Sequence, residues 1–308
     1  MHGFVQKKAP PKVSVFMAVY QQHKFVREAL ESVLAQNYPN MEVIIGDDGS
    51  TDGTQDILKE YAQKHPGVIT LLLSRENLGI TANSNRIFKE CRGTYIAFQA
   101  GDDIWLPNKI TTQVDFMEAN PDCSISYHNL EVFDNATGKS SGFFNDPRTN
   151  YPYEGGADIV IKYGCFNGAI SNMVRRVACP SHGFDTRLPI ASDWLFWIET
   201  LLPGGKIHYI DRVLGKYRIH SANVSQTTSR SVLLNFADHL NSATILLINY
   251  PRYMNDIFFR KAKIYEALSV IDKANYYSYL KISNKLRWNW KNSLRMTAYI
   301  LSFRRFRK

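Results

Sequence analysis

Short apolar runs alternate with segments of helical periodicity over the first hundred residues. The runs are rich in β-branched side chains and cover Val13–Tyr20, Glu42–Gly46, Val68–Leu73 and Thr94–Phe98. Between them, apolar residues recur every three or four positions, which predicts helices near residues 25–34, 54–64 and 80–91. Strands that alternate with helices in this way are typical of a mostly parallel sheet flanked by helices. The fold class expected is therefore α/β, in the Rossmann-like manner.

The pattern becomes less regular after residue 110. It predicts a helix over 108–119, a strand over 123–128, a polar loop over 134–156, a helix from about 157, another within 184–200 and a pair of strands over 206–217. From Ser231 onward nearly every segment has helical periodicity. We expect three parts: a flexible N-terminus at 1–11, an α/β domain at 12–225 and a helical region at 226–308.

Charge is distributed very unevenly along the 308 residues. The net charge is +9, and residues 281–308 hold nine Lys or Arg and no Asp or Glu, so residues 1–280 are formally neutral. A basic surface over the whole protein, as in many nucleic-acid-binding proteins, is therefore not expected. Interleaved with the basic residues are Trp288, Trp290, Leu294 and other apolar side chains, a composition typical of an interfacial helix on anionic lipid. The alternative is a helical tail packed on the α/β domain with solvated charges.

Cysteine content and the N-terminal sequence bear on the cellular compartment. The four cysteines, at 91, 123, 165 and 179, are too far apart for a Cys-x-x-Cys site, and we expect reduced thiols. The first residues resemble no secretory signal, and no run reaches the roughly 18 apolar residues of a membrane span. The expected location is cytoplasmic, with peripheral attachment at the inner face of the plasma membrane as an extension of that prediction.

Two carboxylates follow the second predicted strand. Asp47 and Asp48 open the segment Asp-Asp-Gly-Ser-Thr-Asp-Gly-Thr, which leads into a helix. Ligands of parallel sheets bind at the carboxyl ends of the strands, where such a carboxylate can accept a hydrogen bond from a ribose or a base. The alternative is a capped turn, because Asp, Ser and Thr are the usual residues before a helix.

A second acidic pair, Asp102 and Asp103, follows the fourth predicted strand. Adjacent carboxylates repel each other, so a site that keeps both ionised usually holds a cation. Oxygen ligands at this position suit Mg²⁺ or Mn²⁺ bridging a diphosphate. In the alternative reading one acid caps the following helix and the other faces water.

Two further residues are candidates for chemistry. Asp193 precedes an aromatic, apolar helix, where desolvation would raise its pKa toward that of a general base. His220 follows a predicted strand, ahead of a Ser- and Thr-rich segment over 225–231. Either residue could instead be structural, Asp193 as a helix-terminal acid and His220 as an ordinary buried side chain.

Taken in order, these motifs resemble the family-2 glycosyltransferases of the GT-A type. The resemblance rests on Val-Ser-Val-x-Met-Ala-Val-Tyr, Asp-Asp-Gly-Ser-Thr-Asp-Gly-Thr, Asn-Leu-Gly, Gly-Asp-Asp-Ile-Trp-Leu-Pro, Ser-Asp-Trp and Tyr-Arg-Ile-His-x-x-Asn-Val-Ser, within residues 12–225. It is strongest with bacterial enzymes of surface-polysaccharide or lipopolysaccharide synthesis. The resemblance implies an inverting, metal-dependent transfer from a UDP- or dTDP-type sugar to an acceptor hydroxyl.

The resemblance also assigns roles to single residues. It implies a catalytic base at Asp193, metal ligands at Asp102 and His220, and a nucleotide-sugar site formed by Ala18, Tyr20, Asp48, Asn77 and Asp102, with Asp47 and Asp103 as additional candidates. Relatives commonly read Asp-x-Asp-Asp where this chain has Ala100-Gly-Asp-Asp, so the first acid of the metal motif is missing. The cofactor expected is Mn²⁺ or Mg²⁺.

The expected partners follow from the same reading. They are a nucleotide-sugar donor, a saccharide or lipid-linked saccharide acceptor, and an anionic membrane surface contacted by residues 281–308; nucleic acid is not expected, and a homo-oligomer remains open. Two other classes stay as alternatives. One is a catalytically silent nucleotide-sugar-binding or scaffold protein, suggested by Ala100. The other is a nucleotidyltransferase, which would require a Gly-rich loop after the first strand, where Tyr20–Lys24 has no glycine.

Overall fold

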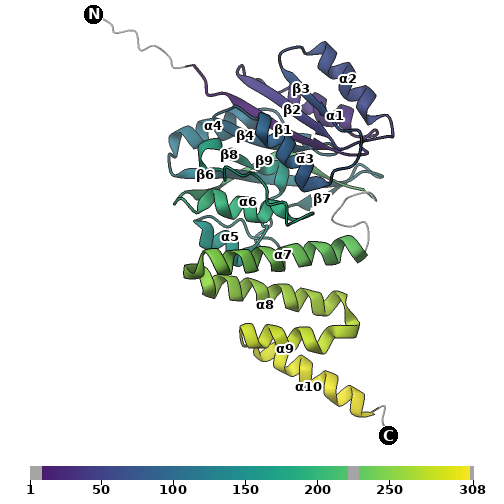
Figure 1. Ribbon diagram of the computed structural model, residues 1–308, viewed down its shortest axis with the longest axis vertical. Coiled ribbons are helices and arrows are strands. Elements are labelled where there is room, and N and C mark those ends of the chain that lie inside the picture. Colours follow the sequence, from purple (N-terminus) through teal and green to yellow (C-terminus); the bar gives the residue numbers. More distant parts are fainter. Residues whose placement is uncertain (1–8, 221–228, 306–308) are drawn as a thin grey trace, which may run out of the picture.

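A computed structural model describes residues 9–220 and 229–305 of the chain (Figure 1). The strands are β1 Val13–Val19, β2 Met41–Asp47, β3 Ile69–Leu73, β4 Tyr95–Ala100, β5 Ile104–Trp105, β6 Cys123–Asp134, β7 Ser140–Phe143, β8 Met173–Arg175 and β9 Lys206–Ile219. The helices are α1 Val26–Leu34, α2 Thr54–Lys64, α3 Ile80–Glu90, α4 Lys109–Ala119, α5 Ala157–Tyr163, α6 Ser192–Leu201, α7 Ser229–Asn249, α8 Met254–Ile271, α9 Tyr276–Leu286 and α10 Trp290–Arg305.

The strands form one mixed sheet in the order β3-β2-β1-β4-β8-β6-β9-β5, with β7 paired to β6. The first four strands are parallel to one another, as the alternation of strands and helices predicts. Strand β8 runs antiparallel to β4 and to β6, and β6 runs parallel to β9. The chain proceeds from β1 to β2 and β3 on one side and returns to β4 on the other, which creates a topological switch point between β1 and β4.

Helices cover both faces of this sheet, and alternate residues of β1 point to opposite faces. Val15 and Met17 pack with α1, α2 and α4, whereas Phe16 packs with α3 and α6. The α/β class predicted from the sequence is confirmed, and Figure 1 shows the helices on either side of the strands. The core on the α6 side is strongly aromatic, with Trp194 and Trp197 almost completely buried.

Two sequence predictions in the second half of the domain are wrong. The polar stretch 134–156 contains strand β7, which forms an antiparallel hairpin with the end of β6. The predicted strand pair over 206–217 is a single strand, β9. Its pairing with β6 passes from Ile210 opposite His128 to Val213 opposite Asn129, so Asp211 and Arg212 form a bulge rather than a turn.

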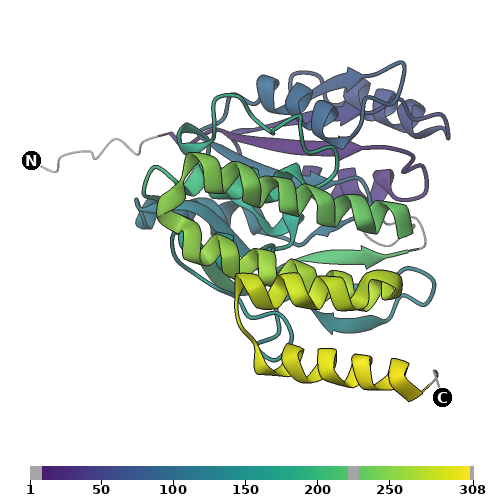
Figure 2. The same ribbon diagram turned by 60° about the horizontal axis from the view of Figure 1, so that its bottom comes forward.

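The helices after residue 228 stack away from the sheet in chain order (Figures 1 and 2). Helix α7 packs against α6, α8 against α7 and α5, α9 against α8, and α10 against α9. Leu246 of α7 and Ile257 of α8 belong to the same buried cluster as Phe98 of the sheet. The inner helices therefore share the core of the α/β domain, whereas α10 lies at the outer edge.

Within the described part of the chain, one helical segment is long and apolar enough to cross a membrane by length and composition, Ser231–Asn249 in α7. The segment carries Asp238 and His239, both of which are buried against the body of the protein. The prediction that no segment is long and apolar enough to span a membrane is therefore wrong for Ser231–Asn249, of which 28% is buried in the protein.

Candidate active site

The carboxyl ends of β1, β2 and β4 meet at the switch point, and small residues line this edge. Ala18 of β1 lies in register with Gly46 of β2 on one side and with Ala100 of β4 on the other. A side chain at Gly46 would collide with Ile87 of α3, whose Cγ1 atom would be 2.5 Å from the added Cβ. Ala100, where relatives have the first acid of the metal motif, thus lies in a row of three small residues across β2, β1 and β4. At these three positions no large side chain covers the backbone.

The loop after β1 is held by the loop after β2. The backbone N–H of Gln21 donates to Ser50 Oγ at 2.8 Å, and that of His23 donates to Asp52 Oδ2 at 3.0 Å. Asp52 also accepts the backbone N–H of Thr54, in the first turn of α2, at 3.1 Å. The second half of the Asp-Asp-Gly-Ser-Thr-Asp-Gly-Thr segment is therefore a capped turn that shapes the neighbouring loop.

The two aspartates that open this segment have different surroundings. Both carboxylate oxygens of Asp48 accept backbone N–H groups, from Leu78 at 2.8 Å and from Gly79 at 3.0 Å. Asp47 accepts Ser50 N–H at 3.0 Å and Gln55 Nε2 at 2.7 Å, both through Oδ2. Its Oδ1 atom is buried without a hydrogen-bond partner among the described residues. Asp47 is thus the aspartate with a carboxylate oxygen still available to a donor.

The other two predicted nucleotide contacts lie beside this pair. Asn77 is exposed, and its side-chain oxygen accepts the backbone N–H of Gly79 at 2.9 Å. Tyr20, at the end of β1, is 44% exposed. Both side chains are therefore accessible at the edge of the sheet where Asp47 and Asp48 lie.

The acidic pair after β4 meets the end of β9. His220 Nε2 lies 2.9 Å from Asp102 Oδ2, and both side chains are largely shielded from solvent. Asp103 is buried and accepts the backbone N–H of Arg218 at 2.8 Å. Burial, together with the neighbouring Asp102, raises the pKa of Asp103 well above its usual range. Asp102 and His220 are the two groups arranged to share a ligand, and Asp103 has a structural contact.

Arg218 is a buried residue of this site for which the sequence provided no role. Its Nε donates to the carbonyl oxygen of Asp102 at 2.7 Å, and its Nη2 pairs with Glu28 of α1 at 2.5 Å. Its guanidinium also lies over the rings of Phe25 and Phe133. Arg218 therefore fixes the acidic loop to α1 and β6. The signal for this role in the sequence was an arginine two residues before a candidate histidine.

Asp193 lies in the first turn of α6, partly exposed, with its Oδ1 accepting the backbone N–H of Trp194 at 2.9 Å. Surrounding protein desolvates its carboxyl group and raises its pKa above the ordinary value, while His239 partly opposes this shift. Trp194 stacks on the ring of His239 at 5.1 Å between ring centroids. This is the environment in which a carboxylate becomes a stronger base.

Hydrogen bonds connect the start of α6 to α3 and α7. Thr81, in the first turn of α3 just after the loop bound by Asp48, has its hydroxyl 2.9 Å from Ser192 Oγ. Asp238 of α7, which no sequence motif singled out, accepts the backbone N–H groups of Ile190 at 2.7 Å and Ala191 at 2.9 Å. The turn that presents Asp193 is therefore anchored from both α3 and α7.

The side chains at this site suit a divalent cation that takes only some of its ligands from the protein. Asp102 offers a hard oxygen and His220 an imidazole nitrogen, and both are suitable ligands for Mn²⁺. The described ranges hold no group of three or more His, Cys, Asp or Glu side chains arranged around a metal position. Two protein ligands suffice where substrate phosphates and water complete the coordination.

The polar stretch 134–156 borders this site at its start. Asn135 accepts a hydrogen bond from Arg218 Nη1 at 2.8 Å. The Ser- and Thr-rich segment over 225–231 lies mostly outside the described residues.

In an open α/β sheet, ligands bind at the carboxyl ends of the strands beside a switch point, which is where the polar residues just described lie. The family model for glycosyl transferase family 2 matches residues 14–177, more than half of the chain. The protein belongs to this family, and the resemblance seen in its motifs is confirmed.

Comparison with curated proteins extends the similarity beyond this segment. The chain is 30% identical over 221 residues to the Escherichia coli UDP-Glc:α-D-GlcNAc-diphosphoundecaprenol β-1,3-glucosyltransferase WfaP, covering 72% of this chain and 82% of the relative. Uncharacterized mycobacterial proteins are 29% identical over 238 residues, and the alignment covers 76% of this chain. It covers 66% of those proteins, so the chain spans just under two thirds of their length.

Solved structures share the fold at low sequence identity. Staphylococcus aureus TarS 1–349 in complex with UDP-GlcNAc superposes with a TM-score of 0.68 at 17% identity, over 89% of this chain and 80% of TarS. The mannosyltransferase PcManGT from Pyrobaculum calidifontis, in complex with GDP-Man and Mn²⁺, gives 0.62 at 17% identity, over 96% of this chain and 81% of that one. These similarities support the GT-A fold.

Proposed function

We propose that this protein transfers a sugar from a nucleotide-diphospho sugar of the UDP or dTDP type to an acceptor hydroxyl, with inversion at the anomeric carbon, in the synthesis of a bacterial cell-surface polysaccharide. The observation that carries the proposal is the contact between Asp102 and His220 at the edge of the sheet that also presents Asp47. Family membership and the UDP-sugar specificity in the name of WfaP support the donor class.

Recognition of the nucleotide is assigned to the ends of β1 and β2. Asp47 offers its unpaired, buried Oδ1 to an N–H group of the base, with Ala18 and Tyr20 beside it. Asp48 and Asn77 hold the turn at residues 77–79, since their side-chain oxygens accept hydrogen bonds from its backbone. This gives Asp47, an additional candidate in the sequence, the contact with the base that was expected of Asp48, because each oxygen of Asp48 already accepts a backbone N–H group.

Asp193 is the general base. Its carboxylate takes the proton from the acceptor hydroxyl as the acceptor oxygen bonds to the anomeric carbon and the bond to the diphosphate oxygen breaks, that electron pair leaving with the diphosphate. A single displacement of this kind requires no nucleophile from the protein and inverts the anomeric centre. Asp102 and His220 would hold Mn²⁺ or Mg²⁺, which when bound neutralises the negative charge that develops on the departing diphosphate.

The acceptor proposed is a lipid-linked saccharide, and the enzyme would work at the inner face of the plasma membrane. The name of WfaP, which includes a diphosphoundecaprenol acceptor, supports this proposal. So do the basic and apolar residues of 281–308. Because Ala100 replaces the first acid of the metal motif, the alternative function is that of a protein of the same fold that binds nucleotide sugars without turnover.

The test is a panel of nucleotide sugars with and without Mn²⁺, measuring both binding and hydrolysis by the wild type, Asp102→Ala and Asp193→Ala. We expect metal-dependent turnover of one donor, lost in both variants, with binding retained by Asp193→Ala. Absence of binding to every nucleotide sugar would overturn the proposal. If the wild type binds a donor but does not turn it over even with lipid-linked saccharide acceptors present, the alternative function is favoured.

A further inference from the structure

The α9–α10 hairpin carries large apolar side chains that the rest of the protein leaves in solvent. Trp288 is 73% exposed, Trp290 is 55% exposed and Leu294 is 59% exposed. By contrast, the other three tryptophans, Trp105, Trp194 and Trp197, are at most 2% exposed. Figure 1 shows α10 at the end of the helical stack that is farthest from the sheet.

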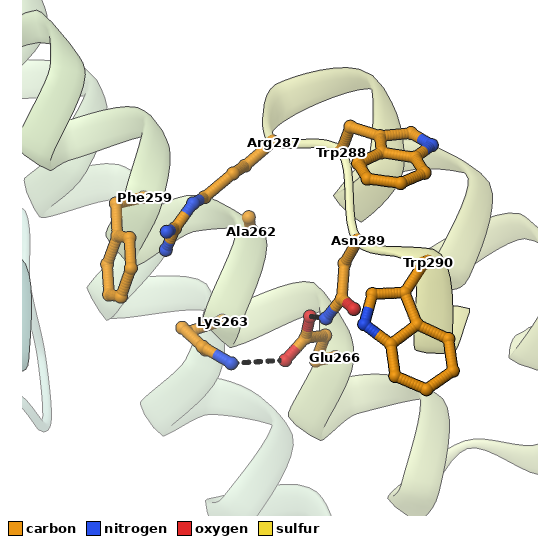
Figure 3. A pocket seen from close by; sticks show the side chains of 8 residues that line it. All are labelled: Phe259, Ala262, Lys263, Glu266, Arg287, Trp288, Asn289 and Trp290. Carbon is orange, nitrogen blue, oxygen red and sulfur yellow. Dashed lines mark hydrogen bonds and ion pairs between the residues drawn. The ribbon is translucent and has the colours of Figure 1, made fainter. Parts of the chain in front are cut away.

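Two hollows open on this hairpin, and the first lies at the turn between α9 and α10 (Figure 3). It has a volume of about 290 Å³, and Trp288 and Trp290 stand beside it. The guanidinium of Arg287 lies 4.1 Å from the centre of the Phe259 ring and has no carboxylate partner among the described residues. The ring of Phe259 therefore supports the guanidinium of Arg287, and the N–H groups of Arg287 are available to donate hydrogen bonds to an anion.

One acid lines the first hollow, and its charge is already engaged. Glu266 pairs with Lys263 at 2.8 Å and accepts hydrogen bonds from Asn289 at 3.1 Å and Asn292 at 2.8 Å. The positive charge of Arg287 is left without a counter-charge in the hollow.

The second hollow lies further along α10 and has a volume of about 430 Å³. It is lined by Lys273, Arg295, Tyr276, Ala298 and Tyr299, so two cations and two aromatic rings face it without an acidic residue. The two hollows thus repeat one chemistry, a cation beside aromatic rings, and each takes one arginine, Arg287 or Arg295, from the segment 281–308 that has nine basic residues and no acid.

We propose that the α9–α10 hairpin is a docking surface for a bilayer rich in anionic phospholipid, with lipid phosphates entering the two hollows and Trp288 and Trp290 in the headgroup region. Indole rings favour that region, and basic side chains are attracted to anionic headgroups. Nucleic acid is the weaker fit, because the basic residues do not continue onto the formally neutral residues 1–280. The biological reason for such docking rests on the proposed function, since a lipid-linked acceptor requires the enzyme at a membrane.

The experiment is sedimentation of the full-length protein with vesicles of phosphatidylcholine alone or with phosphatidylglycerol at one part in three. Binding is expected only to the anionic vesicles and is expected to weaken with added salt. Equal binding to both vesicle types, or none to either, overturns the proposal, as does preferential binding to a DNA or RNA duplex at the same ionic strength.

Matched charge variants locate the surface. Arg287→Gln with Arg295→Gln removes one cation from each hollow, and we expect partitioning to fall about tenfold. The control is Lys89→Gln with Lys139→Gln, which removes the same charge from exposed positions of the α/β domain and should leave partitioning within about twofold. Equal losses in the two double variants would show a nonspecific charge effect and reject the hollows.

Tryptophan fluorescence gives an independent readout. Brominated acyl chains should quench emission when the protein binds, because Trp288 and Trp290 reach the bilayer while the buried tryptophans do not. Trp288→Phe with Trp290→Phe should abolish the quenchable fraction, and persistence of that quenching would contradict the proposed orientation. Donor hydrolysis in solution should be unchanged in every hairpin variant, so failure of docking and failure of the transferase proposal are distinguishable.

Discussion

His220 Nε2 lies 2.9 Å from Asp102 Oδ2, although 118 residues separate them in the sequence. The contact joins the end of β9 to the end of β4, so the candidate metal ligands come from opposite halves of the domain. This arrangement also bears on Ala100: with no first acid in the motif, the imidazole is the candidate for a second protein ligand beside Asp102.

Metal binding should therefore depend on both residues. Asp102→Asn and His220→Ala should each weaken Mn²⁺ binding by about 10- to 100-fold, because removal of either ligand leaves one protein group to hold the ion. Electron paramagnetic resonance of Mn²⁺ titrated in the presence of UDP measures this directly. His182→Ala is a suitable control, since His182 pairs with Glu199 at 3.2 Å on the exterior. Undiminished Mn²⁺ affinity in His220→Ala would exclude the imidazole as a ligand.

The two aspartates after β2 should separate into a binding role and a structural role. Asp47→Asn should weaken UDP affinity about 10-fold or more, through loss of a charge-assisted hydrogen bond to the base. Asp48→Asn should instead lower the free energy of unfolding by about 1–3 kcal/mol, because its new amide would face a backbone N–H at residue 78 or 79. Calorimetric titration and urea denaturation of both variants check the pair; the reverse pattern would restore the original assignment of Asp48.

Arg218 should stabilise the acidic loop after β4 more through the geometry of its hydrogen bonds than through its positive charge. We expect Arg218→Ala to cost about 3 kcal/mol of folding free energy, because buried hydrogen bonds to charged groups are lost together. Lysine keeps the charge but not the planar set of donors, so Arg218→Lys should recover only part of the loss. Glu28→Gln, which changes an exposed partner, should cost about 1 kcal/mol or less. Urea denaturation of the three variants tests this order, and a smaller loss for Arg218→Ala than for Glu28→Gln would contradict it.

Asp238 should support the catalytic base from a distance. Asp238→Ala leaves the N–H groups of Ile190 and Ala191 without their acceptor, at a cost of about 3 kcal/mol in stability. Because that turn presents Asp193, kcat should fall while donor affinity is kept. Ser242→Ala, on the same helix, removes only a bond to a helix carbonyl and should change stability by less than about 1 kcal/mol. Thermal unfolding and steady-state kinetics distinguish the two variants, and an unchanged kcat in Asp238→Ala would separate this contact from catalysis.

The pH profile of transfer should reflect the raised pKa of Asp193. A general base acts in its ionised form, so kcat should rise with pH through a pKa that burial places above the ordinary value of 3.8. Asp193→Asn should reduce kcat by about 100-fold or more and remove this limb of the profile, while leaving donor binding intact. The profile is measured with a saturating donor; persistence of the acid limb in Asp193→Asn would assign it to another group.

Local patterns in the sequence were sufficient for the first half of the fold. The four parallel strands and their helices follow from apolar periodicity, because a buried strand and a helix buried on one face each leave a regular pattern of apolar residues in the local sequence. The strand pair predicted over 206–217 is wrong because a bulge and a turn have the same local polarity, and only pairing with β6 distinguishes them.

Motifs identified the residues of the candidate site but not all of their contacts. Asp47 and Asp48 are adjacent in sequence, and their difference arises from a loop 30 residues away. Asp238 lies in an apolar helix pattern, where a buried acid is unusual, but its partners are backbone groups that no pattern of side chains reveals. Long-range hydrogen bonds to the backbone could not be predicted from the sequence.

The sharing of the core by Leu246, Ile257 and Phe98 has a practical consequence for dissecting the protein. A fragment that ends near residue 225 would lose α7 and α8, expose the aromatic side of its interior to water and lack the acceptor for the turn before Asp193. Such a fragment should aggregate rather than serve as a soluble catalytic unit. A truncation that removes only the α9–α10 hairpin has to begin beyond Asp272, after α8 is complete.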